Sequence, residues 1–290
     1  MKNKKQSKKL IVIFLALISS TCFQLPVFAD DGSLIMGVFP RRPAQTTIQA
    51  FTPLAEYLSE KLKREVKLVT TYDFTSFWQD IEKKKYDIVH YNQYQYIQSH
   101  KEFGYQVIVM NEEFNKTTIS SVLISKNPNI TSLKDIAGKT IAFGGGPKAM
   151  VSYILPIYTL RNAGITNFQF KSIFAINPPN AMMSVYFDRA DVAGVGNKVV
   201  EMSDVKNNIS AAKLKIISQS EEISQLPWAV KNNMPKELKS TIQELFINLK
   251  NDDKNKIILS TSNVTNFVIA KDSDYNRTRE IVFEVTGVQY

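Results

Sequence analysis

Short apolar runs alternate with amphipathic segments through most of the chain after residue 30. In the first part of the chain, the apolar runs have the length of strands and lie at 34–39, 66–69 and 87–89. Apolar residues also recur every three or four positions, which predicts helices at 51–62, 74–85 and 92–101. An alternating order of strands and helices predicts parallel strands with helices packed on both faces of the sheet.

A second unit of the same kind begins near residue 120. It has predicted strands at 122–124, 140–143 and 191–195, a short helix at 133–139 and a long helix at 147–162. Beyond residue 217 the pattern becomes helical, at 236–249, 252–259 and 274–285. Pro156 predicts a kink, and Pro53 either kinks its helix or begins it after a Thr52 cap. We expect an α/β fold of two lobes, with the chain crossing between them.

The first 29 residues have the pattern of a secretory signal peptide rather than of a folded segment. Five lysines precede an apolar run at 10–18, and Ala29 ends a Val-Phe-Ala sequence suited to cleavage. The apolar run is short for a membrane span. These features predict cleavage after Ala29 and a periplasmic or secreted protein, with an uncleaved anchor as the alternative.

The single cysteine, Cys22, lies within this leader. Ser19, Ser20 and Thr21 precede it and fit poorly with the pattern of a lipoprotein, so we favour a soluble protein over one anchored through Cys22. Cleavage after Ala29 would leave no cysteine. The mature chain would then have neither disulfides nor thiolate chemistry.

The charge of the chain does not suggest a nucleic-acid partner. The formal net charge is +9, and it falls to +4 when the five lysines of the leader are removed. A surface this mildly basic lacks the strong positive stripe of a nucleic-acid-binding protein. It is compatible with the attraction of an anionic solute.

Three glycines between a predicted strand and the long helix form the most distinctive motif of the chain. Gly144, Gly145 and Gly146 precede Pro147 and Lys148. Glycine lets backbone N–H groups turn toward one point, and a helix start adds unpaired N–H groups, so the turn could bind an anion. The alternative is a flexible connection. Lys148 could likewise place a charge beside an anion or be solvated.

Other candidate ligand contacts follow the predicted strands, because ligands of parallel sheets bind beyond the carboxyl ends of the strands. An arginine there could bind a carboxylate or phosphoryl group with two hydrogen bonds. Aromatic and amide side chains suit a polar ligand with some apolar surface. These candidates are Arg41, Tyr72, Phe74, Tyr91, Asn92, Gln93, Asn177 and Asn197. His90 is expected to be structural.

The chain carries little that would support catalysis. Its two histidines, His90 and His100, are ten residues apart. Neither a His-Glu-x-x-His motif, a Gly-x-Ser-x-Gly elbow nor a Walker-type Gly-Lys-Ser occurs. We expect a binding protein rather than an enzyme, with no cofactor and no metal site.

Several segments resemble one family in the same order. The sequence Ser-Leu-Lys-Asp-Ile-Ala-Gly-Lys-Thr-Ile-Ala-Phe at 132–143 is similar to a stretch of type II solute-binding proteins of ABC transporters. The segments 37–40, 53–58 and 153–156, with Gly164 and Ile165, resemble the phosphate/phosphite/phosphonate branch of this family. The resemblance covers essentially the whole chain after the leader.

The resemblance implies two α/β lobes, each a mostly parallel sheet flanked by helices, joined by two crossing strands and closing on a small ligand. On this chain the lobes would be 30–119 plus 219–290 and 120–218. The implied function is delivery of the ligand to the permease of an ABC importer, by a protein that acts as a monomer. A secreted module that senses or carries the ligand is the alternative.

The chain departs from the family pattern where the ligand would be recognised. The Ser-Thr-Ser-Gly type cluster of the family is replaced by the glycine turn at 144–150, and a usual tyrosine by Phe74. A Gly-Pro turn is replaced by Tyr91, Asn92 and Gln93. The ligand is therefore expected to be a small anion, either phosphonate-like or phosphate-like, or another organic anion.

Overall fold

The structure is a computed structural model and describes residues 32–290. The predicted signal peptide, its cleavage site and Cys22 lie outside the described residues. Over residues 32–290, the helices are too short or too polar to cross a membrane.

The first sheet has six strands in the order β13-β4-β12-β3-β1-β2. Their bounds are β1 Leu34–Val38, β2 Val66–Val69, β3 Ile88–His90, β4 Gln106–Glu112, β12 Pro227–Val230 and β13 Asn266–Ile269. β1 pairs in parallel with β2 and β3, which confirms the parallel unit expected from the sequence. β12 is antiparallel to both β3 and β4, so β4 runs in the same direction as the first three strands. Only β12 and β13 run the other way.

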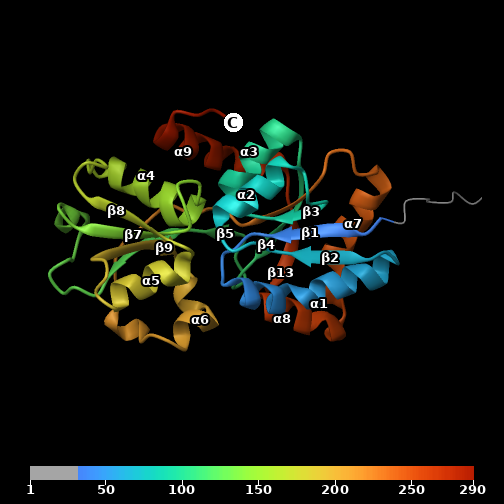
Figure 1. The fold of residues 1–290 in the computed structure, drawn as a ribbon, viewed down its shortest axis with the longest axis horizontal. Coiled ribbons are helices and arrows are strands. Elements are labelled where there is room, and N and C mark those ends of the chain that lie inside the picture. Colours follow the sequence, from blue (N-terminus) through green and yellow to red (C-terminus); the bar gives the residue numbers. More distant parts are fainter. Residues whose placement is uncertain (1–31) are drawn as a thin grey trace, which may run out of the picture. The chain divides into compact units, whose positions relative to one another are not determined.

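Helices cover both faces of the first sheet (Figure 1). Their bounds are α1 Ala44–Leu62, α2 Phe74–Glu82, α3 Gln93–Phe103, α7 Lys236–Asn248, α8 Lys256–Ser262 and α9 Asn276–Thr286. On one face, α1, α7 and α8 pack over a cluster that contains Leu54, Trp228 and Phe246. On the other face, α2, α3 and α9 enclose an aromatic cluster with Phe77 and Tyr91.

α1 resolves the two interpretations of Pro53. The helix begins at Ala44, directly after Pro43, so the alternative start after a Thr52 cap is wrong. Pro53 lies inside the helix. Proline has no N–H group, so the carbonyl of Gln49 lacks its usual hydrogen bond within the helix. Gln49 is exposed, and water can donate to this carbonyl instead.

The second sheet has five strands in the order β10-β6-β9-β7-β8. Their bounds are β6 Ser121–Ser125, β7 Thr140–Gly144, β8 Lys171–Ala175, β9 Val192–Gly196 and β10 Lys215–Gln219. β7 is parallel to β8 and β9, and β6 is antiparallel to β9 and β10. Four of the five strands therefore run in one direction. The helices beside this sheet are α4 Leu155–Asn162, α5 Pro178–Tyr186 and α6 Ser203–Lys206.

The long helix predicted at 147–162 starts later and has two parts. Met150–Ile154 form a wide π-helical turn, named η2, and α4 follows directly. The N–H of Leu155 donates to the carbonyl of Met150, five residues back. Pro156 lies in the first turn of α4, where a missing N–H costs little, so the proline marks a change of helix type rather than a kink in a long α-helix.

Two short strands join the sheets. β5 Thr118–Ile119 leads from the first sheet to the second, β11 Ile223–Ser224 leads back, and the two pair antiparallel. The result is a two-lobed α/β fold with two crossing strands. The sheets agree with the lobes expected from the sequence, whose limits at 30–119 plus 219–290 and 120–218 stay a prediction.

Candidate functional site

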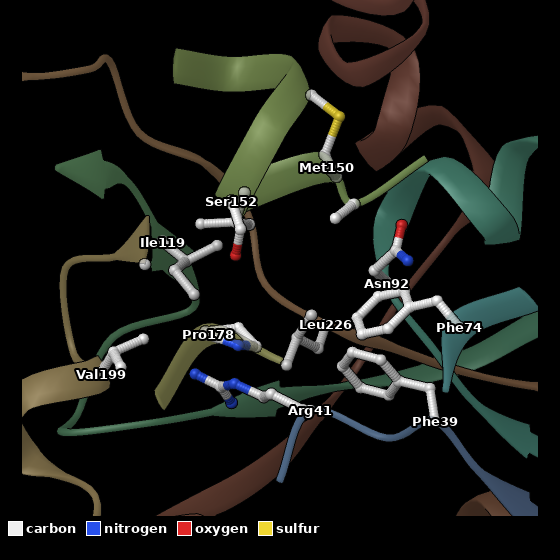
Figure 2. A pocket seen from close by; sticks show the side chains of 13 residues that line it. Phe39, Arg41, Phe74, Asn92, Ile119, Met150, Ser152, Pro178, Val199 and Leu226 are labelled. Atoms are coloured by element: carbon white, nitrogen blue, oxygen red, sulfur yellow. The ribbon is translucent and has the colours of Figure 1, made fainter. Parts of the chain in front are cut away.

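A small cavity lies where the ends of the two sheets meet the crossing strands (Figure 2). The space open to the centre of a water-sized sphere is about 30 Å³, which is room for one or two water molecules. Ile119 from β5 and Leu226, just after β11, also line it. The cavity suits a compact group in the state that the structure shows.

The wall on the side of the first sheet consists of aromatic side chains and one amide side chain. Phe39 follows β1 and Phe74 begins α2, and their rings meet edge to face with centroids 5.8 Å apart. Asn92 also lines this wall. Its Oδ1 accepts hydrogen bonds from the backbone N–H groups of Tyr94 and Gln95, so the side chain caps α3.

The wall on the side of the second sheet is the start of η2. The N–H groups of Tyr153 and Ile154 both donate to the carbonyl of Ala149. The preceding N–H groups, those of Met150, Val151 and Ser152, have no backbone acceptor among residues 32–290, as expected for the first turn of a helix. All three residues line the cavity.

Ser152 adds a side-chain hydroxyl to this helix start. The residue is buried, and Figure 2 shows its oxygen turned toward the cavity. The sequence predicted that the glycine turn, which carries no hydroxyl, could bind an anion. The structure places a hydroxyl six residues beyond Gly146, in the first turn of the helix. The signal for it was present in the sequence as a polar residue at the start of an otherwise apolar helix.

The glycine turn lies beside the cavity but does not line it. The N–H of Gly145 donates to the carbonyl of Ala175 over 2.8 Å, so it is not available to a ligand. A Cβ atom on Gly144 would lie 2.3 Å from the Cα of Pro178. Gly145 has a φ of +102°, which only glycine adopts without strain. Gly144 and Gly145 thus allow a close approach of backbone, and Gly146 has open space around it.

Arg41 lines the cavity but is already paired. Its Nη1 and Nη2 donate to the two carboxylate oxygens of Glu113, over 2.7 and 3.3 Å. Asn111 also donates to Glu113, and Trp228 donates through Nε1 to Asn111. Burial raises the pKa of Glu113, but the arginine charges and these hydrogen bonds outweigh it and hold the pKa below its usual value of 4.5. Arg41 therefore faces the cavity with a compensated charge.

Three other candidates near the first sheet lie away from the cavity. Tyr91 is fully buried and its hydroxyl bonds to that of Ser99 over 2.8 Å, so it belongs to the aromatic core. Gln93 donates through Nε2 to the carbonyl of Ser224, at the crossing strand β11. Tyr72 is 70% exposed.

Lys148, which follows β7 of the second sheet, contacts two helices that pack on the first sheet. Its Nζ donates to Oε1 of Gln98 over 3.0 Å and lies 4.7 Å from the centre of the Trp78 ring. Gln98 is in α3 and Trp78 is in α2, so the lysine links the turn after β7 to the helices of the first sheet. The ammonium group is directed toward these partners rather than toward the cavity.

Asn177 and Asn197 occupy supporting positions. Asn177 accepts a hydrogen bond from the N–H of Asn180 and caps α5, whose first residue Pro178 does line the cavity. Asn197 donates its backbone N–H to the carbonyl of Ser120, and its Oδ1 is buried without a protein partner in the described part of the chain. Of the twelve candidates, the structure brings Arg41, Phe74 and Asn92 to the cavity wall.

His90 is structural, as expected. It is buried, stacks on Trp228 with ring centroids 4.4 Å apart, and bonds through Nδ1 to the carbonyl of Pro227. Burial lowers its pKa to about 3, so the ring is neutral near pH 7. Across residues 32–290, no group of three or more His, Cys, Asp or Glu side chains could hold a metal ion.

The two sheets, the two crossing strands and the cavity at their meeting point define a type II periplasmic-binding-protein clamshell, a class of protein that holds a small solute between two lobes. Residues 36–275 match the family described as "ABC transporter, phosphonate, periplasmic substrate-binding protein". The chain belongs to this family, whose members are transport proteins that capture a solute for an ABC importer.

Individual relatives are distant but similar over most of their length. The phosphonates-binding periplasmic protein of Escherichia coli K12 is 20% identical over 288 residues, which cover 95% of this chain and 85% of the relative. The binding-protein component of an ABC phosphonate transporter from Pseudomonas aeruginosa has the same fold, with a TM-score of 0.80 and 19% identity over 88% of this chain and 87% of that one. PhnD1 from Prochlorococcus marinus, solved in complex with methylphosphonate, has a TM-score of 0.79 and 18% identity, with 89% and 100% coverage.

Proposed function

We propose that this protein captures a small tetrahedral oxyanion with a short apolar substituent, of the phosphonate type, and presents it to an ABC permease. The observation that carries the proposal is the meeting of two unlike surfaces at one cavity. Unpaired N–H groups and the Ser152 hydroxyl face it from one side, and the rings of Phe39 and Phe74 face it from the other.

The polar side would hold the oxygens of the ligand. The N–H groups of Met150, Val151 and Ser152 lie at the positive end of the helix formed by η2 and α4, which favours negative charge. The Ser152 hydroxyl adds a donor that can rotate toward an oxygen. Backbone N–H groups and one hydroxyl would thus bind the ligand oxygens in place of the Ser-Thr-Ser-Gly type cluster of the family pattern.

The apolar side would hold the substituent. Phe39, Phe74, Ile119 and Leu226 offer carbon surface within the same cavity. A methyl or other short alkyl group on the phosphorus would be removed from water there, at about 25 cal/mol per Å² of apolar area. Inorganic phosphate would place a fourth polar oxygen against these residues and lose hydration without a partner.

Closure of the two lobes would complete the site. We propose the lobe limits 30–119 plus 219–290 and 120–218, with bending at the β5–β11 crossing. Contacts such as that of Lys148 with Gln98 and Trp78 support this, because they join the two sides only when the sides are together. A ligand that touches both walls would favour the closed state.

The remaining features of the proposal concern the setting of the protein. The family is periplasmic. We propose that this chain is cleaved after Ala29 and is soluble rather than lipid-anchored. We also propose that it acts as a monomer and docks on a permease. We also propose that the protein binds its ligand without turnover. His90 supports this, because it is buried and neutral and its Nδ1 is bonded to the carbonyl of Pro227. It is therefore not placed to exchange a proton with a ligand.

The experiment begins with protein from its native host, which is denatured so that any released small molecule can be identified by mass spectrometry. A thermal-shift series with phosphate, phosphite, methylphosphonate, methanesulfonate and acetate then compares the classes. At a hundredfold excess over Kd, a ligand should stabilise the protein by about 2.7 kcal/mol. Methylphosphonate or a close analogue should raise Tm more than phosphate does. Stabilisation by acetate alone, or a released molecule without an acidic group, would exclude this ligand class.

A further inference from the structure

A two-residue turn after β4 holds a large side chain in an unfavourable backbone conformation. The N–H and carbonyl of Glu113 bond to the carbonyl and N–H of Lys116, each over 3.0 Å, so Phe114 and Asn115 form the turn. Their φ angles are +54° and +59°. Positive φ at both central positions is typical of a type I′ turn, where Gly, Asn and Asp are the usual residues. Asn115 fits this pattern, whereas the bulky Phe114 is held there with backbone strain.

Packing in the core does not account for a phenylalanine at this position. The side chain of Phe114 is 43% exposed, and within residues 32–290 it lies outside the clusters that form the buried cores. Asparagine would suit the same turn with less strain. A strained residue outside the core points to a role other than the stability of the fold.

The ring of Phe114 lies beneath a lysine from the other side of the site. Nζ of Lys198 is 4.6 Å from the centre of the ring. Phe114 follows β4 of the first sheet, whereas Lys198 follows β9 of the second. An ammonium group over the face of a ring is attracted by the π electrons. The contact therefore joins the two sides of the site, as the contact of Lys148 with Trp78 does at another point.

The contact of Phe114 with Lys198 covers the outer side of the Arg41–Glu113 pair. A small hollow lies there, and its lining includes Arg41 and Glu113 as well as Phe114 and Lys198. The space open to the centre of a water-sized sphere is about 10 Å³, enough for at most one water molecule. Glu113 directly precedes Phe114, so the same turn holds a carboxylate on Arg41 and a ring under Lys198. Separation of the ring from the lysine would expose this side of the pair to water.

Hydrogen bonds from the turn hold it on the first sheet and near the crossing strands. The N–H of Asn115 donates to Oγ1 of Thr265, just before β13, over 3.2 Å. Nζ of Lys116 donates to Oε1 of Glu222, just before β11, over 2.9 Å. The turn therefore belongs to the same side of the site as Arg41.

We propose that Phe114 is a positioning residue for closure on the ligand. Its strained backbone holds the ring where Lys198 reaches it only when the two sides of the site come together. The contact then stabilises the closed state, whereas the strain is present in the open and the closed state alike. This inference rests on the proposed function. It adds a residue that does not line the main cavity and that raises ligand affinity at a cost to the stability of the free protein.

The first test replaces the ring by a side chain that suits the turn. Phe114→Asn removes the strain and the contact with Lys198 together. The ligand-free variant should unfold about 2 °C or more above the wild-type protein in a thermal scan. Its Kd for methylphosphonate, measured by calorimetry, should be about two- to fivefold higher, as expected for the loss of an exposed cation–π contact. A residue with a role in stability alone would not give these opposite effects.

Two controls separate the ring from the backbone. Phe114→Tyr keeps both the ring and the strain, so its Tm and its Kd should stay at the wild-type values. Lys63→Asn relieves a left-handed residue elsewhere, since Lys63 has a φ of +50° at the C-terminal end of α1. This variant should raise Tm and leave Kd unchanged.

The lysine provides an independent test. Lys198→Met should raise Kd by the same factor without a rise in Tm, and Lys198→Arg should keep the wild-type Kd because a guanidinium group also binds a ring face. Lys171→Met removes the same charge at the end of β8 that lies away from Gly144, and should leave Kd unchanged. In the double variant Phe114→Asn/Lys198→Met, Kd should rise no further than in either single variant, because the two residues make one contact.

The outcomes also separate this inference from the proposed function. If the wild-type protein binds methylphosphonate and Phe114→Asn has an unchanged Kd or a lower Tm, the role of Phe114 is wrong and the ligand class stands. Effects on Kd that add in the double variant would overturn the role in the same way. If methylphosphonate does not bind the wild-type protein, the proposed ligand class fails, and the role of Phe114 in closure on it fails as well.

Discussion

Gly145 lies directly against the ring of Phe74. A Cβ atom on the glycine would come within 3.1 Å of two carbons of that ring, Cε2 and Cζ. The glycine follows β7 of the second sheet, and the phenylalanine begins α2 beside the first sheet. This is one of the points where the two sides of the site touch through van der Waals contact, so the space at residue 145 controls how closely they approach.

Gly145→Ala should therefore impair both stability and ligand binding. A φ of +102° costs a non-glycine residue about 1–3 kcal/mol, and the new methyl group would press on Phe74. We expect a lower free energy of unfolding in denaturant titration and weaker binding of methylphosphonate. Gly146→Ala is the control, since nothing lies within 4 Å of a Cβ atom there. Equal effects of the two variants would show that the contact with Phe74 does not limit closure.

Ser152→Ala should weaken ligand binding without loss of stability. The hydroxyl is turned toward the cavity rather than into the packed core, so its removal should cost the folded protein little stability. A hydrogen bond to a charged ligand is worth about 1.5–3 kcal/mol, which corresponds to a Kd roughly ten- to a hundredfold higher. Calorimetry with methylphosphonate measures the effect. Ser184→Ala provides a comparison, because that hydroxyl bonds to the carbonyl of Asn180 in α5. Wild-type affinity in Ser152→Ala would remove the hydroxyl from the site.

Lys148→Met should make the closed state less stable while leaving each lobe folded. The variant loses the hydrogen bond to Gln98 and the contact of the ammonium group with the Trp78 ring. We expect a loss of a few-fold in ligand affinity, since a partly exposed cation–π contact is worth about 0.5–1 kcal/mol.

Trp78 also reports on this contact. The chain has two tryptophans, and Trp228 is buried in the core. A change in tryptophan emission when ligand is added should be smaller in Lys148→Met than in the wild-type protein. Lys134→Met, on the short helix Leu133–Ile136, is the control. An unchanged emission response in Lys148→Met would show that the lysine does not follow closure.

His90 should make the protein less stable as the pH falls. The folded protein holds its pKa at about 3, mainly by burial, whereas an unfolded chain protonates near 6.5. Between these values the unfolded state binds more protons, so the free energy of unfolding decreases by up to about 1.4 kcal/mol per pH unit as the pH is lowered. In His90→Gln this contribution disappears. Urea titrations from pH 7 to pH 4 should give a shallower slope for the variant, and parallel slopes would contradict the assignment.

The sequence predicted the parallel core of each sheet because βαβ units leave strong local signals. β2 at Val66–Val69 coincides with its predicted range, and β7 differs by one residue. The strands that complete the sheets were missed. β12 has four residues, begins with Pro227, and forms a strand because it pairs with β3 and β4 from distant parts of the chain. Pairing of this kind is a tertiary effect that local patterns do not contain.

The binding site stays a prediction, and the structure shows only where its candidate residues lie. Strand ends indicated where Arg41, Phe74 and Asn92 would lie. They could not show that Glu113, 72 residues away, binds the guanidinium of Arg41. The glycine turn attracted attention as a donor of N–H groups, whereas the N–H of Gly145 is used by Ala175. Which donors stay unpaired depends on where the helix begins, and local sequence gives such boundaries poorly.

The π-helical turn at Met150–Ile154 has a consequence for how this site could change over evolution. Each turn of this kind contains one more residue than an α-helical turn, as the bond from Leu155 to Met150 shows. Deletion of one residue from it would rotate everything before the turn by about 100° relative to α4 and shift it by about 1.5 Å. The donors at Met150 and Val151 would then point elsewhere while α4 kept its packing. A change in the length of one turn can thus change the direction of the N–H donors without a change in the type of the side chains beside them.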